Sequence, residues 1–148
     1  MRTLLKASGL IFLFLASSAI AQLSNPKWKP IVISQSKRIW YDSASVNPAG
    51  QDKIDVWMLE IYDHPLTFVQ IPGEIYRSKT LYAIDLKRAT YGIKEVDYYN
   101  IDNREIFNHD YKIDDYPDSV KYSYPIMENS PLHLLLRDLF KNKTKATN

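Results

Sequence analysis

Three histidines are the residues in this chain whose chemistry best suits metal binding or proton transfer. They stand at His64, His109 and His133, no two of them are spaced i,i+4, and the chain contains no cysteine. A zinc site needs three or four ligands in a compact arrangement. The spacing therefore predicts ordinary surface or loop histidines and no metal site.

Carboxylates are concentrated in the last third of the chain, at Asp102, Glu105, Asp110, Asp114, Asp115 and Asp118. The calcium-loop pattern D-x-[DN]-x-[DN]-G is not matched there, and no glycine follows Gly92. Two carboxylates flanking a sugar could hydrolyse a glycosidic bond, but nothing in the sequence places two of them around a cleft. A solvated acidic surface is the favoured interpretation.

Motifs for nucleophilic catalysis and for phosphate binding are absent from the sequence. A serine nucleophile of the hydrolase type would need a turn such as G-x-S-x-G, and nucleotide binding would need a glycine-rich loop. Neither pattern occurs in the chain. We therefore expect a protein that is not an enzyme and that has no catalytic residues and no cofactor.

Basic side chains offer one candidate protein-binding surface. Lys37, Arg38, Lys87 and Arg88, together with lysines near both ends of the exported chain, could join into a surface that attracts an acidic partner. The alternative is that they are edge and surface residues that keep strands soluble. The sequence favours the second interpretation and leaves both open.

The first 21 residues have the pattern of a secretory signal peptide. Arg2 and Lys6 precede an apolar run at residues 10–16, and small residues at Ala19 and Ala21 give the A-x-A cleavage signal before Gln22. The apolar run is shorter than the roughly 20 residues that span a bilayer. We expect cleavage after Ala21, no remaining membrane span, no lipid anchor, and a location in the periplasm, at the cell surface or outside the cell.

Removal of that segment changes the charge of the chain. It holds two of the 19 basic residues and none of the 17 acidic ones, so the exported chain has 17 of each and a formal net charge of zero. The remaining basic residues are scattered, whereas nucleic-acid binding needs them clustered on one face. Nucleic acid is therefore a poor candidate for the partner.

Hydrophobic alternation predicts two long strands. In residues 52–63, Ile54, Val56 and Met58 share one face, whereas the residues between them share the other. Residues 76–87 alternate in the same way, with Thr80, Tyr82, Ile84 and Leu86 on one face. Shorter runs at residues 31–33, 37–41, 93–99, 105–111 and 120–124 predict further strands, and proline and glycine predict a loop at residues 63–74.

One helix is predicted at the end of the chain. Ser130 and Pro131 suit a helix start, and leucines at positions 132, 135, 136 and 139 form one apolar face. We predict an α+β domain: an antiparallel sheet of about six strands with one C-terminal amphipathic helix, from Pro131 to about Lys141, on one face. Residues 22–27 are predicted to be a flexible lead-in and residues 142–148 a disordered tail.

Several short motifs follow one another along the chain. They are Trp28, Trp40-Tyr-Asp-Ser43, Val56-Trp57, Tyr76-Arg-Ser78, Ile84-Asp85 and Ser130. In order and spacing they resemble the surface-adhesin protein E family of exported bacterial domains. The resemblance covers about residues 26–141, and the corresponding domain is placed at residues 28–141.

The chain departs from this family at two positions. The family commonly has one cysteine directly after the strand aspartate and another near the end of the last helix, and these form a disulfide. Leu86 and Phe140 hold those positions here. The resemblance therefore implies an apolar helix–sheet contact in place of the disulfide, with Leu86 against Leu139 or Phe140.

The resemblance also sets the leading hypothesis for function. It implies a non-catalytic exported binding domain, an adhesin for host extracellular-matrix proteins such as vitronectin and laminin, which can form a homodimer. The alternative is a periplasmic accessory or structural protein that has no host ligand.

Overall fold

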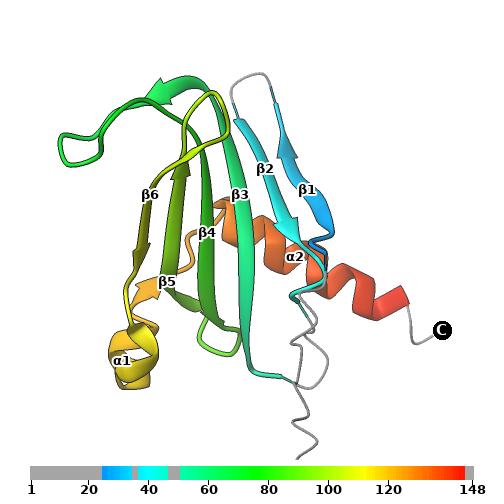
Figure 1. Ribbon diagram of the computed structural model, residues 1–148. Coiled ribbons are helices and arrows are strands. Elements are labelled where there is room, and N and C mark those ends of the chain that lie inside the picture. Colours follow the sequence, from blue (N-terminus) through cyan, green and yellow to red (C-terminus); the bar gives the residue numbers. More distant parts are fainter. Residues whose placement is uncertain (1–24, 35–36, 47–50, 146–148) are drawn as a thin grey trace, which may run out of the picture.

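The computed structural model describes residues 25–34, 37–46 and 51–145 (Figure 1). The predicted signal peptide and its cleavage site between Ala21 and Gln22 lie outside the described residues. So do part of the predicted turn at residues 47–52 and the last three residues of the predicted tail. Of the predicted lead-in, residues 25–27 are described and are exposed, and the backbone N–H of Lys27 donates to Asp42 Oδ1 at 2.7 Å.

The fold is an antiparallel meander in which each strand pairs with the next one in the chain. The strands are β1 (Trp28–Ile33), β2 (Lys37–Asp42), β3 (Lys53–Leu66), β4 (Ile75–Asp85), β5 (Thr90–Tyr99) and β6 (Glu105–Asp110). A two-residue strand, β7 (Tyr124–Pro125), pairs with the start of β5. Together with the C-terminal helix, this arrangement confirms the predicted α+β fold.

The predicted faces of the two long strands are confirmed. Ile54, Val56 and Met58 of β3 are at most 6% exposed. Val56 lies opposite Tyr82 of β4, and Met58 lies opposite Thr80, so the two predicted faces meet on the same side of the sheet. This side carries the hydrophobic core.

Helix α2 (Pro131–Lys145) covers that side and contacts β1 (Figure 1). Its leucines at positions 132, 135, 136 and 139 pack with Ile39 and Tyr41 of β2 and with the buried residues of β3 and β4. At its start, the backbone N–H of His133 donates to Ser130 Oγ at 3.2 Å, as expected for a serine cap. The helix ends at Lys145, four residues later than predicted, because no glycine or proline follows Lys141 to stop it.

The structure shows one side of the predicted helix–sheet contact. Leu86 packs against the core cluster that contains Leu139. Phe140 is 40% exposed, because successive helical residues turn by about 100° and Leu139 takes the position that faces the sheet. A direct contact between Leu86 and Phe140 stays a prediction.

The opposite side of the sheet is closed near Ala83 by the segment after β6. This segment contains a short 3-10 helix, η1 (Ile113–Asp115), and one helical turn, α1 (Asp118–Lys121). A Cβ on Gly92, which lies opposite Ala83, would come within 2.0 Å of the Lys121 carbonyl oxygen. Only glycine permits this approach of the segment to the sheet.

One predicted strand boundary is wrong in this segment, and the predicted start of the loop between β3 and β4 is also wrong. Residues 120 and 121 belong to α1 instead of a strand, because Pro117 and Asp118 favour a helix start and the backbone N–H of Val120 donates to the Pro117 carbonyl. Strand β3 continues to Leu66, past the predicted loop start at Asp63, with a register shift after Ile61 that accommodates a proline.

We predict that stability falls at alkaline pH through Tyr41, which is 1% exposed and donates to Asp138 Oδ2 on α2 at 2.9 Å. Burial, and then the Asp138 carboxylate, raise the pKa of Tyr41 to about 12. A phenol whose folded pKa is raised contributes fully below its unfolded pKa near 10 and loses that contribution as pH rises towards 12. The loss amounts to roughly 3 kcal/mol.

The measurement is urea unfolding at several pH values from 7 to 12 for the wild type, Tyr41→Phe and Tyr116→Phe. Tyr41→Phe should be less stable at pH 7 and should lose less between pH 10 and 12, because it has no phenol to ionise. Tyr116 is 53% exposed, so its variant should follow the wild type. Parallel curves of unfolding free energy against pH for all three proteins would contradict the prediction.

Candidate binding groove

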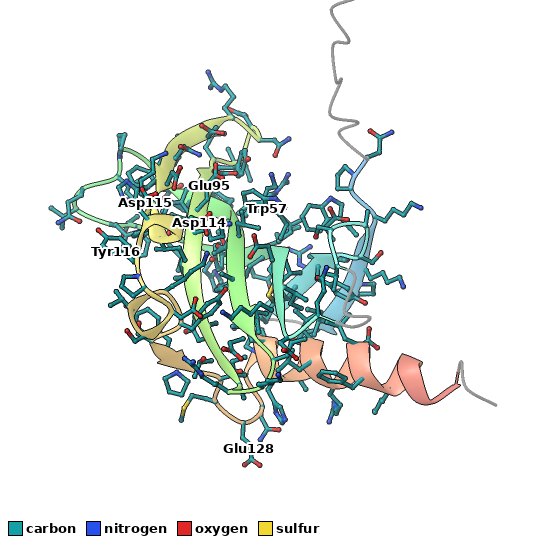
Figure 2. The ribbon with its side chains drawn as sticks, turned by 90° about the horizontal axis from the view of Figure 1, so that it is seen from below. Trp57, Glu95, Asp114, Asp115, Tyr116 and Glu128 are labelled. Carbon is teal, nitrogen blue, oxygen red and sulfur yellow. The ribbon has the colours of Figure 1, made fainter. Side chains whose placement is uncertain are left out.

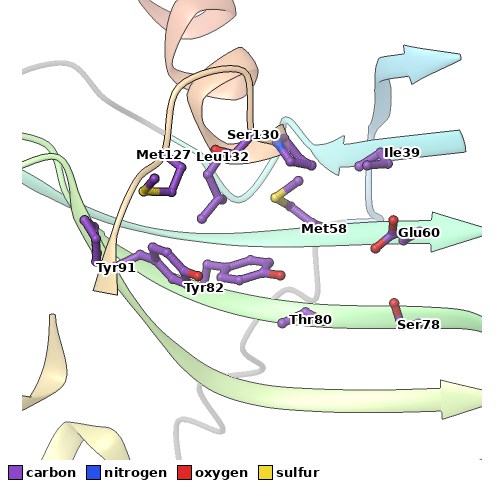
Figure 3. A pocket seen from close by; sticks show the side chains of 12 residues that line it. Ile39, Met58, Glu60, Ser78, Thr80, Tyr82, Tyr91, Met127, Ser130 and Leu132 are labelled. Atoms are coloured by element: carbon purple, nitrogen blue, oxygen red, sulfur yellow. The ribbon is translucent and has the colours of Figure 1, made fainter. Parts of the chain in front are cut away.

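A hollow of about 150 Å³ lies where the start of α2 approaches the sheet (Figure 3). Its walls come from the middle of β3 and β4, from single residues of β2 and β5, from the segment between Pro125 and Ser130, and from the first two residues of α2. The side chains that point into it are mostly apolar, with hydroxyls and one carboxylate among them. Those labelled in Figure 3 are Ile39, Met58, Glu60, Ser78, Thr80, Tyr82, Tyr91, Met127, Ser130 and Leu132.

A second hollow, of about 170 Å³, continues from the first towards β6. The two hollows share Glu60, Ser78, Thr80 and Tyr82 as a common wall. The second hollow extends over side chains of β5 and of the residue after β6, among them Val96, Tyr98 and Tyr111. We call the two hollows together the groove.

The common wall of the groove is held by a small polar network. Tyr62 Oη lies 2.8 Å from Ser78 Oγ and donates to Glu60 Oε2 at 3.4 Å, and Lys37 Nζ lies 3.2 Å from Glu60 Oε1. Burial raises the pKa of Tyr62, and the Glu60 carboxylate raises it further. The Tyr62 hydroxyl is therefore neutral at physiological pH.

The pKa of Tyr82 is raised in the same way. Burial raises its pKa to about 12, and Glu60 acts in the same direction. Its ring packs edge-on against Tyr91, with 5.7 Å between the ring centroids. Because Tyr62 and Tyr82 stay protonated near pH 7, they present ring faces and neutral hydroxyls, which suits binding through apolar contact and hydrogen bonding.

A row of aromatic rings extends the groove to the edge of the sheet. It consists of Phe68, Tyr98, Phe107, His109 and Tyr111, with consecutive centroid distances of 6.0, 5.8, 6.2 and 4.5 Å. We call this set the aromatic row. Phe68 and Tyr111 are 46% and 45% exposed. The row therefore presents ring surface to solvent beside the second hollow.

The face of the sheet away from α2 has an aromatic residue of a different kind. Trp57 lies on that face, as does Glu95 (Figure 2). The ammonium of Lys79 lies 3.9 Å from the centroid of a Trp57 ring and 3.8 Å from Asp97 Oδ2. The Trp57 ring therefore already has an intramolecular partner, which makes this face a weaker candidate than the groove.

The predicted basic surface is not assembled. Lys37 and Arg38 lie at the end of the sheet where β2 starts, next to Ile61 and Tyr62 of β3. Lys87 and Arg88 lie at the other end of β3, because they follow Asp85, which pairs with Lys53. The structure thus places the two pairs apart.

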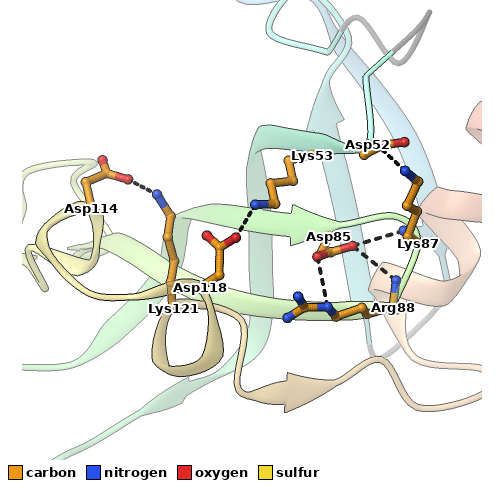
Figure 4. Close-up of polar contacts among 8 residues, drawn as sticks. All are labelled: Asp52, Lys53, Asp85, Lys87, Arg88, Asp114, Asp118 and Lys121. Atoms are coloured by element: carbon orange, nitrogen blue, oxygen red, sulfur yellow. Dashed lines mark hydrogen bonds and ion pairs between the residues drawn. The ribbon is translucent and has the colours of Figure 1, made fainter.

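Each of these four basic residues also has an acidic partner. Lys37 pairs with Glu60, Arg38 with Asp63 at 2.8 Å, Lys87 with Asp52 at 2.6 Å, and Arg88 with Asp85 at 3.6 Å. Asp85 is buried and also accepts hydrogen bonds from the backbone N–H groups of Lys87 and Arg88 (Figure 4). The Lys87–Arg88 pair therefore helps to form the β4–β5 turn.

Part of the acidic stretch is likewise engaged within the chain. Lys121 contacts Asp114, and Lys53 contacts Asp118 (Figure 4). These lysines hold the pKa of both carboxyls below the usual value. In the described part of the chain, no three histidines or carboxylates come together as ligands for a metal ion.

Within residues 25–145, leaving aside the two undescribed gaps, no helix is long and apolar enough to cross a membrane.

Comparison with known proteins gives no relative. No family model, no curated protein and no solved structure matches the chain. The resemblance to the surface-adhesin protein E family stays a prediction.

Sequence reasoning did not find the groove. Glu60, Tyr62 and Ser78 come from two strands, and only the register of β3 against β4 brings them together. Part of the aromatic row had a signal, since Phe107, His109 and Tyr111 alternate and must share a face of one strand. No local pattern could show that α2 leaves that face uncovered.

We predict that Tyr62 and Ser78 are energetically coupled in the common wall. Ser78 is 5% exposed, so removal of the Tyr62 hydroxyl leaves its oxygen without its partner and costs about 1 to 2 kcal/mol. In a double-mutant cycle of Tyr62→Phe and Ser78→Ala, the coupling energy from urea unfolding should be about 1 kcal/mol. Strictly additive losses of unfolding free energy in the two single variants would show that the two hydroxyls do not interact.

Proposed function

We propose that this chain is a non-catalytic, exported binding domain that holds an extended segment of a protein partner in the groove. One observation carries the proposal: two hollows lie in line and share a wall of four residues. Side chains of an extended segment that point to the same side recur at a regular spacing. Two adjoining hollows suit two such side chains.

The size of the hollows favours side chains over a small-molecule substrate. Pockets for small molecules usually enclose about 300–1,000 Å³. The hollows measure about 150 and 170 Å³, so each suits one apolar side chain. Pockets that bury an anchoring side chain at the centre of an interface are typical of protein–protein contacts.

The chemistry of the lining supports the same partner class. Apolar side chains such as Met58, Met127 and Leu132 can bury an apolar anchor, and the neutral hydroxyls of Tyr82 and Ser78 can bond to a backbone. Tyrosine and methionine are enriched at protein interfaces, and methionine adapts to the shape of what it contacts.

The resemblance to the adhesin family supplies the leading identity of the partner, a host extracellular-matrix protein. The alternative is a periplasmic accessory protein that uses the same groove for a partner in the cell envelope. Location separates the two functions. Protease treatment of intact producing cells should degrade a surface adhesin, whereas a periplasmic protein should survive and be released with the periplasmic fraction.

We predict that filling the first hollow from the loop weakens binding. Met127 lines the hollow but is 66% exposed, so Met127→Trp can occupy the space without overpacking the core. Binding of the exported chain to immobilised vitronectin and laminin should weaken at least tenfold, which corresponds to about 1.4 kcal/mol. The measurement is biolayer interferometry.

Val120→Trp is the matched control, because Val120 is 54% exposed and is not part of the groove. It should bind like the wild type. Unchanged binding of Met127→Trp would contradict the groove as the site. Failure of the wild-type chain to bind either protein would contradict the matrix partner.

A further inference from the structure

The two edges of the sheet differ in their protection against added strands. Strand β1 has an exposed proline, Pro30, followed by a register shift before Val32, and an exposed lysine, Lys29. Proline, irregular register and lysine are the features that keep an edge from pairing with another chain. Edge β1 is therefore poorly suited to accept a strand.

Strand β6 is less protected, because its register shift against β5 lies at its start, between the pairs Tyr99–Glu105 and Tyr98–Phe107. Its six residues, from Glu105 to Asp110, include no proline and no lysine, and four of them are exposed. Among the described residues, only β5 pairs with it. From Phe107 to Asp110 the register against β5 is regular, so the other edge of this part of β6 is regular and open.

The register shows which backbone groups point outward. The backbone N–H of Tyr111 donates to the Lys94 carbonyl at 2.8 Å. In an antiparallel ladder such hydrogen-bonded pairs alternate with non-bonded ones, so His109, opposite Val96, bonds towards β5 in the same way. The backbone N–H and C=O groups of Asn108 and Asp110 then point away from the sheet.

We propose that this edge of β6 takes an extended, basic segment of a partner protein as an additional strand. The inference deepens the proposed function and rests on it, because the aromatic row lies along β6 on the side of the groove. Addition of a strand supplies backbone hydrogen bonds, and pockets for alternate side chains supply specificity. A segment on β6 can direct alternate side chains over the aromatic row.

The acidic residues of β6 and of neighbouring β5 favour a basic partner segment. Strand β6 carries Glu105 and Asp110 and no lysine or arginine, and Glu95 of β5 lies opposite Asp110. Lys112 pairs with Asp110, whereas no described basic group forms an ion pair with the exposed Glu105 or with Glu95. Oppositely charged residues on neighbouring strands stabilise the pairing.

The same charges disfavour a second copy of this chain. A second copy would bring its own β6, which also carries Glu105 and Asp110 and no lysine or arginine, against this edge. Like charges on neighbouring strands destabilise their pairing. A basic segment has no such conflict.

The test compares two substitutions at one position. Asn108 donates from its side chain to Glu95 and Asp97, and both Asn108→Ala and Asn108→Pro remove those bonds. Only Asn108→Pro also removes the outward N–H. The probe is an eight-residue, end-blocked, fluorescently labelled peptide of alternating lysine and valine, with an alternating glutamate and valine peptide as control, and the readout is fluorescence anisotropy.

We expect the lysine peptide to bind the wild type at least tenfold more tightly than the glutamate peptide does. Asn108→Pro should weaken that binding at least tenfold relative to Asn108→Ala. Equal binding by the two variants, or no binding of the lysine peptide at 1 mM, would overturn the proposal. If Asn108→Pro does not fold, as judged by circular dichroism, Asp110→Pro against Asp110→Ala repeats the test, because that N–H also points outward.

Two further readouts separate this inference from the other possibilities. A dimer in sedimentation that dissociates in Asn108→Pro but not in Asn108→Ala would assign the edge to a second copy and overturn the basic segment. Loss of matrix binding in Met127→Trp with equal binding by the two Asn108 variants would leave the groove in place and overturn only the edge pairing.

Discussion

The packing of α2 on one side of the sheet is the contact on which the rest of the structure depends. Four leucines of the helix bury themselves against residues of β2, β3 and β4, including Ile39, Tyr41 and Val56. The chain has no cysteine, so this apolar contact has the role that disulfides have in many small exported domains. The hydrogen bond from Tyr41 to Asp138 adds a directional tie within the same contact.

The limits of that contact create the binding surface that we propose. The helix covers the side of the sheet towards β1 and leaves the β5–β6 side of the same face open. The first hollow forms where the helix begins, and the second hollow and the aromatic row follow on the open side. On the other face, the approach of Lys121 to Gly92 closes part of the sheet, and Lys79 covers Trp57.

Local patterns were sufficient to predict the long strands and the C-terminal helix of this fold. Alternation identified the buried face of β3, and leucine spacing identified the buried face of α2, because both periods are properties of a single element. The segment after β6 differs from the prediction because Pro117 and Asp118 favour a helical turn where the sequence predicts a strand at residues 120–124. The site could not be predicted, because Glu60, Ser78 and Met127 meet only through strand register and the placement of a loop.

The same difference between local pattern and strand order explains why the predicted basic surface is not assembled. Their sequence positions allowed one surface, but the antiparallel order places Lys37 and Lys87 at opposite ends of β3. Charge pairing then engages each of them with a nearby carboxylate. Whether basic residues that are separated in the sequence form one surface therefore depends on the strand order of the whole sheet.

The proposed binding surface is tested most directly by hydrogen–deuterium exchange of the protein with and without vitronectin. The groove and the β6 edge together predict slower exchange in two segments on binding: β6, at the outward amides of Asn108 and Asp110, and the loop from residue 126 to residue 130. Slower exchange at β1 alone, or no change anywhere in a mixture at saturating concentration, would contradict this assignment.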